Sequence, residues 1–292
     1  MNIKSVKSGF GIGCLVFAAA AVIALPVRIL QFFTVIESGT GFYTETDWSV
    51  YLLYIVLAAA IIAILALGIA KRKKLDYSLE YTRRPGLSSL SLIAACGILL
   101  DAYNCFIRFI SEETVTTASG SSLDSSKLII MLEGVFALLS AIYFIMLWLT
   151  YLKGNSNGSG FWLLSLTPVL WSIFRLVVRF MRTISYIRVS ELLIEMIMIS
   201  FMILFFMIFA QVNCGINGKG NEWKIAAYGL PAALTALICF IPRLVVMISG
   251  NSHLFYSESG LEFCDFGIAL FIIATVLTRI TDKLPDENTS EE

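Results

Sequence analysis

The sequence has little charge and almost no histidine, and both shortages exclude classes of function. Only 14% of its 292 residues are charged, and His253 is the single histidine. One histidine excludes zinc sites built on several imidazoles, and any Ser–His or Cys–His catalytic pair would have to use this one residue. Acidic and basic residues balance to zero net charge, so a nucleic-acid partner has no electrostatic support.

Cysteine motifs and long polar segments are also missing. The six cysteines form no CxxC pair, no zinc-ribbon spacing and no disulfide framework. The connections between apolar stretches are short, and the two longest cover residues 71–86 and 111–126. No soluble catalytic domain fits in such a connection. We therefore expect no cofactor and no metal site, and the sequence does not favour an enzyme.

Long apolar runs are abundant. Hydrophobic residues make up 58% of the chain, more than a soluble fold can bury, so lipid must be the solvent for much of it. Because a spanning helix needs about 20 apolar residues, the sequence predicts an all-α polytopic transmembrane bundle with about eight spans, forming one integral membrane domain, 1–292. The predicted spans are 11–36, 49–70, 87–110, 127–151, 161–182, 189–212, 224–248 and 260–280.

The charges in the connections predict an orientation. Lysine and arginine concentrate in the connection 71–84, and basic residues also flank the first and last spans. The first connection instead carries Glu37, Glu45 and Asp47 and no basic residue. By the positive-inside rule this pattern predicts a cell-membrane protein with both termini in the cytoplasm. An alternative makes the first span a cleaved signal peptide, which would leave seven spans.

Two connections suggest further organisation. Residues 154–160 contain only glycine, asparagine and serine, a composition typical of a flexible link, and divide the chain into two possible halves, 1–153 and 161–292. The basic connection 71–84 could contact a partner subunit or anionic lipid. Its ordinary alternative is positive-inside anchoring.

Charged side chains inside the spans gather in the predicted outer half of the membrane. A charge at mid-bilayer costs at least ~2.5–3.5 kcal/mol, so such groups normally face the bundle interior and pair with one another. We therefore predict a polar site open toward the outside, where a small anionic ligand could bind. Its candidate ligand-binding residues are Arg28, Gln31, Asp101, Asn104, Arg108, Glu133, Arg175, Arg179, Glu195, Arg243 and Asp265.

Two other interpretations of these charges stay open. A structural salt-bridge network accounts for the same residues, and matching of charges to helix dipoles accounts for those at the span ends. The residues assigned to dipole matching are Arg182, Arg188, Glu191 and Glu262. Prolines within the first, fifth and seventh spans would free backbone carbonyls near the site. These prolines are Pro26, Pro168, Pro231 and Pro242.

Three functions fit this pattern. The first is a transporter or permease in which clustered arginines hold a small anionic or zwitterionic solute. The second is a receptor, sensor or accessory subunit that binds a ligand or partner without passage. The third is a membrane enzyme acting on a lipid-linked phosphate, for which the sequence offers no nucleophile–base motif.

Overall fold

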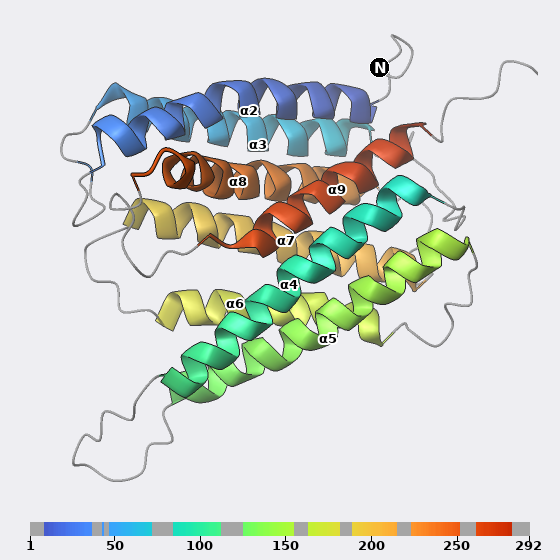
Figure 1. The fold of residues 1–292 in the computed structure, drawn as a ribbon. Coiled ribbons are helices and arrows are strands. Elements are labelled where there is room, and N and C mark those ends of the chain that lie inside the picture. The colour runs from blue at the N-terminus through green and yellow to red at the C-terminus, as the bar shows by residue number, and fades with distance from the viewer. Residues whose placement is uncertain are drawn as a thin grey trace, which may run out of the picture.

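The computed structural model describes residues 9–36, 43, 47–71, 84–111, 125–154, 163–181, 189–214, 223–251 and 261–281. Within these residues every long element is a helix, and the helices form one bundle (Figure 1). Seven of them are long and apolar enough to cross a membrane, so the predicted all-α, multi-pass architecture is supported. In chain order the helices are α2 (Gly9–Thr34), α3 (Trp48–Lys71), α4 (Pro85–Ser111), α5 (Ser125–Lys153), α6 (Thr167–Met181), α7 (Val189–Asn213), α8 (Trp223–Ile248) and α9 (Phe263–Thr281).

The two shortest helices differ from the predicted spans. α6 follows a short 3-10 turn, η3 (Leu164–Leu166), so the apolar segment is Leu164–Met181 where the sequence predicts 161–182. Pro168 lies in the first turn of α6, where the backbone N–H has no helical acceptor in any case. It is the second residue of α6, which begins at Thr167, so it does not interrupt the helix. α9 has a shorter apolar stretch, Phe263–Thr278, and the eighth crossing depends on it.

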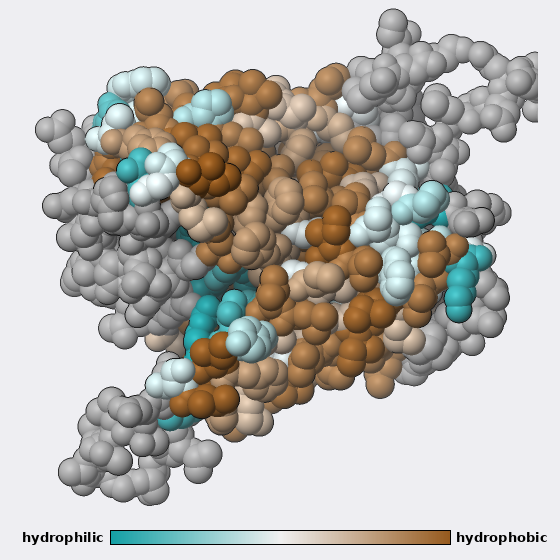
Figure 2. Space-filling model, in the orientation of Figure 1, coloured by the Kyte–Doolittle hydropathy of each residue, from teal (hydrophilic) through white to brown (hydrophobic). Residues whose placement is uncertain are grey.

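α8 is the central helix of the bundle. It contacts α2, α3, α7 and α9, and most of its side chains are buried. α3 lies at the edge, with Leu53 and Ile64 buried but Ile55 and Ile62 exposed. Exposed apolar residues cover most of the face seen in Figure 2. Soluble proteins rarely expose an apolar surface of this extent, so the surface fits contact with lipid.

Glycines bring α4 into close contact with α9, and the two run side by side, obliquely to α2 and α3 (Figure 1). A Cβ added at Gly97 would lie 2.8 Å from the Cα of Cys264, and one at Gly267 would lie 3.0 Å from the Cα of Ala94. Small residues allow such backbone approach between membrane helices. Asp101 follows Gly97 by one turn, so the crossing brings it toward the start of α9.

The bundle has two chemically different ends. α2 begins and α9 ends at one of them, here named the terminal end (Figure 1). Among the described residues its buried side chains carry no charge: they include the apolar Ile64, Ala226, Leu230 and Val276 and the hydroxyl groups of Ser88 and Ser165. The opposite end, named the charged end, holds the buried charges of the described residues. Those charged side chains are Arg28, Asp101, Glu133, Arg175, Arg179, Glu195, Arg243 and Asp265.

Candidate functional site

A continuous chain of ion pairs, named here the ion-pair network, lies at the charged end. Three arginines from α6 and α8 alternate with three carboxylates from α7, α9 and the residue before α9. Equal numbers of opposite charges make the group neutral, which lowers the cost of burying it. The order is Asp265, Arg175, Glu262, Arg179, Glu195 and Arg243, with N–O distances of 2.6 Å for Arg175–Asp265, 3.4 Å for Arg179–Glu195 and 2.5 Å for Arg243–Glu195.

Helix periodicity explains the central part of this network. Arg175 and Arg179 are one turn apart on α6 and therefore share a face. Glu262 and Asp265 are three residues apart and meet that face from the start of α9. Two stripes of opposite charge thus lie against each other between α6 and α9.

Glu262 joins the two arginines of α6. Its carboxylate accepts hydrogen bonds from the Nη2 groups of both Arg175 and Arg179. Its side chain is 15% exposed, whereas the other five members of the network are 2–8% exposed. Burial alone would raise the pKa of Glu262, but the guanidinium groups of Arg179 and Arg175 outweigh it and hold this pKa well below its usual range. Glu262 is therefore an ionised bridge.

Sequence reasoning missed Glu262 as a site residue. Its position at a span start led to its assignment to helix-dipole matching, whereas the structure shows it in direct contact with two buried arginines. The signal that could have found it is its spacing of three residues from Asp265, which puts both carboxylates on one side of the chain.

Arg28 lies beside the network. Its Nη1 donates hydrogen bonds of 3.0 Å to Gln31 and to the hydroxyl of Tyr43, and Gln31 donates to the carbonyl of Ser49 at 2.9 Å. Arg28 and Arg243 line the same cavity between α2, α7 and α8, which has a volume of about 10 Å³. Such a cavity holds about one water molecule, so it is too small for an organic solute in this conformation.

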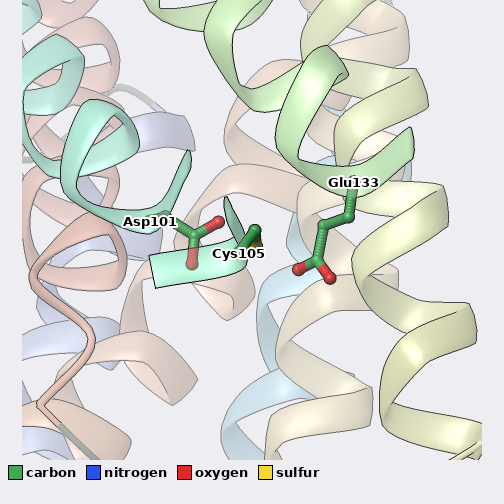
Figure 3. A group of neighbouring side chains, drawn as sticks. All are labelled: Asp101, Cys105 and Glu133. Atoms are coloured by element: carbon green, nitrogen blue, oxygen red, sulfur yellow. The ribbon is translucent and has the colours of Figure 1, made fainter. Parts of the chain in front are cut away.

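Asp101, Cys105 and Glu133 form a second group at the charged end, named here the acidic trio. Figure 3 shows the three side chains directed toward one another from α4 and α5, and their possible ligand atoms all lie within 4.8 Å of one another. Asp101 accepts a hydrogen bond of 3.0 Å from the indole Nε1 of Trp171. The Trp171 ring also packs against the Arg175 guanidinium, at 5.4 Å, so it connects the trio to the network.

Two predicted candidates are not joined to either group by a hydrogen bond or an ion pair in the part of the chain that the structure describes. Asn104 is exposed on α4 and Arg108 is half-buried. Within the described residues neither makes a side-chain hydrogen bond or ion pair. The basic connection, apart from Lys71 and Arg84, lies outside the described residues, and so does His253. The remaining candidates are buried at one end of the bundle, as the sequence predicts for groups facing its interior.

No protein-family model, no curated protein and no solved structure matches this chain. Its function is therefore inferred from the ion-pair network, the acidic trio and the membrane-type bundle that holds them.

Proposed function

We propose that this protein is a membrane transporter for a small anionic or zwitterionic solute, with the ion-pair network as its binding site in a closed state. The bridge formed by Glu262 carries this proposal. A carboxylate held by two buried guanidinium groups is the contact that arginines make with an anionic solute. Glu262 thus occupies the position that a solute carboxylate would take.

Exchange of one carboxylate for another explains how the site can open without leaving a buried arginine unpaired. A solute anion that displaces Glu262 keeps both arginines paired, so the number of charges in the low-dielectric interior stays balanced. Glu262 suits this exchange because it precedes α9 and is the most exposed member of the network. The Nε of Arg175 is buried without a hydrogen-bond partner among the described residues, and it offers the solute a further donor.

The displaced Glu262 also suits a zwitterionic solute. Its released carboxylate can pair with the ammonium group while the solute carboxylate binds Arg175 and Arg179. On the distribution of lysine and arginine in the connections, the charged end faces outward and the termini are cytoplasmic. In this orientation the solute enters the binding site from outside the cell.

A receptor, sensor or accessory subunit is the second candidate. The cavity beside Arg28 and Arg243 favours it, because its volume of about 10 Å³ leaves no room there for a solute to pass. The side chains packed around Leu230 are apolar, and the buried side chains at the terminal end carry no charge among the described residues, so they offer a passing anion no ion pair. In this function the solute binds at the charged end. A partner subunit that contacts residues 71–84 then responds to solute binding.

Binding and flux measurements separate these functions. The purified chain is reconstituted in liposomes, and a panel of labelled lactate, succinate, alanine and glutamate is tested for saturable binding and uptake. We expect at least one to bind and to cross. Arg175→Ala should abolish binding, whereas Arg108→Ala, which changes a half-buried arginine outside the network, should preserve it.

Glu262→Gln provides the sharper test. Removing the internal competitor should tighten binding of a purely anionic solute such as succinate about tenfold, equivalent to 1.4 kcal/mol, whereas a zwitterionic solute, which also loses its ammonium partner, should gain less. Binding without uptake would support the receptor function instead. Absence of binding by both the wild type and Glu262→Gln would refute the network as a solute site.

A further inference from the structure

We propose that the acidic trio binds a divalent cation of the zinc class. This inference is independent of solute transport, because the trio and the ion-pair network share no residue. Two carboxylates and one thiol from α4 and α5 meet in the bundle interior, and all three side chains are buried. Figure 3 shows that their polar atoms point into the same space.

Among the described residues the carboxylates of the trio form no ion pair, whereas those of the network do. Among the described residues, neither Asp101 nor Glu133 has a basic group within ion-pair distance. Glu133 is 4% exposed, and its Oε2 has no hydrogen-bond partner in the described part of the chain. A buried carboxylate without a partner is costly, so this oxygen requires a cation or a proton. The charges of Arg175, Arg179 and Arg108 all act on Glu133, but Arg175 and Arg179 are already paired with other carboxylates and Arg108 forms no ion pair with it in the described part of the chain.

Helix packing builds the trio as a unit. Asp101 and Cys105 are one turn apart on α4 and share a face. Glu133 reaches them because α4 and α5 approach closely at Gly134, where an added Cβ would lie 3.3 Å from the Cβ of Cys105. A cation bound here would therefore link α4 to α5.

The two carboxylates and the thiol of the trio determine which class of metal can bind. Calcium and magnesium prefer oxygen donors alone, whereas a thiolate beside two carboxylates suits zinc and similar cations. Zinc bonds of about 2.0–2.3 Å separate tetrahedral ligand atoms by roughly 3.3–3.8 Å, so ligands now within 4.8 Å would close by about 1 Å. Three protein ligands leave a fourth position for water.

Trp171 provides the support that metal ligands usually have. Its indole N–H donates to Oδ2 of Asp101, which leaves Oδ1 available to a cation and fixes the orientation of the carboxylate. Such hydrogen bonds to ligating groups typically change metal affinity by 10–100-fold. On binding, the Cys105 thiol loses its proton to solvent, so affinity should rise with pH.

Metal titration of the full chain in detergent tests the proposal. After treatment with a chelator, Co²⁺ is titrated and its thiolate charge-transfer absorption is followed, and Zn²⁺ is then used to displace it. We expect saturation at one Co²⁺ per chain. Cys105→Ser should remove the absorption band, and Glu133→Gln should weaken binding at least tenfold. Zn²⁺ should also raise the melting temperature of the wild type.

Two cysteine variants serve as controls. Cys96→Ser changes an exposed thiol on the same helix, and Cys264→Ser changes a buried thiol beside Asp265. Both should bind Co²⁺ like the wild type. If the wild type binds neither Co²⁺ nor Zn²⁺, the two carboxylates share a proton and the proposal is wrong. Wild-type binding by folded Cys105→Ser and Glu133→Gln would also overturn it.

Discussion

The two ends of the bundle are closed by different forces, although the same helices build both. At the terminal end α8 packs Ala226 and Leu230 against other apolar side chains. At the charged end the same helix contributes Arg243, which pairs with Glu195. The terminal end is held by many weak contacts, and the charged end is held by a few strong ones.

This difference determines which end of the bundle a ligand can open. Lipid is as apolar as most buried side chains of the terminal end, so packing and a few neutral hydrogen bonds hold that end together, and no anion can replace these contacts selectively. An ion pair, in contrast, has a specific substitute, because another anion can take the place of a carboxylate. A ligand can therefore open the charged end by exchange, whereas the terminal end would open only through movement of whole helices.

Removing Glu195 should have the largest effect on stability. Glu195 pairs with both Arg179 and Arg243, and its loss would leave two buried guanidinium groups undercompensated. We expect Glu195→Ala to lower the free energy of unfolding by about 3–5 kcal/mol. Unfolding in mixed micelles with increasing SDS measures the change.

Leu230→Ala is the matched substitution at the terminal end. Leu230 is 2% exposed, so the substitution leaves a gap in a packed interior. We expect a cost below about 2 kcal/mol, because lipid solvates the apolar side chain in the unfolded state almost as well as protein does. A larger loss for Leu230→Ala than for Glu195→Ala would contradict the distinction between the two ends.

Much of the fold is predictable from the sequence because long apolar runs with polar ends are strong signals. The predicted span 224–248 corresponds to α8 (Trp223–Ile248), and 189–212 corresponds to α7 (Val189–Asn213). Spacing within one helix is equally informative, as the shared face of Arg175 and Arg179 shows. The start of α6 is harder to predict, because the residues of the 3-10 turn before Pro168 are as apolar as those of the helix.

The pairing of the charges was not predictable, because it depends on which helices are neighbours. The sequence shows Glu262 near a span end, but only the packing of α9 against α4 and α8 sets its distance from α6. Close packing at Gly97 and Gly267 determines that arrangement, and a glycine in an apolar span does not reveal its partner. The sequence therefore predicts which end is charged, and packing decides how the charges pair.

Gly97→Ala should have an intermediate effect, and it tests the link between packing and charge. The added Cβ would lie 2.8 Å from the Cα of Cys264 and 2.9 Å from the carbonyl oxygen of Phe263, so α4 and α9 must separate. Overpacking of this kind costs about 1–3 kcal/mol. Gly86→Ala on the same helix is the control, because its Cβ would meet nothing within 4 Å. Equal stability of the two variants would show that this close approach does not hold the charged end.

Acidification should have the smallest effect, and it should act on the charged end through Glu262. The pKa of Glu262 in the folded protein lies well below the value of about 4.3 expected for an unfolded glutamate. The bridge therefore contributes its full stability above that pH, and the contribution falls as the pH drops toward the folded-state pKa. We expect the melting temperature of the wild type to fall between roughly pH 5 and pH 3, and that of Glu262→Gln to fall less. Identical pH profiles would mean that Glu262 does not close the charged end, since a bridge held by charge must weaken when that charge is neutralised.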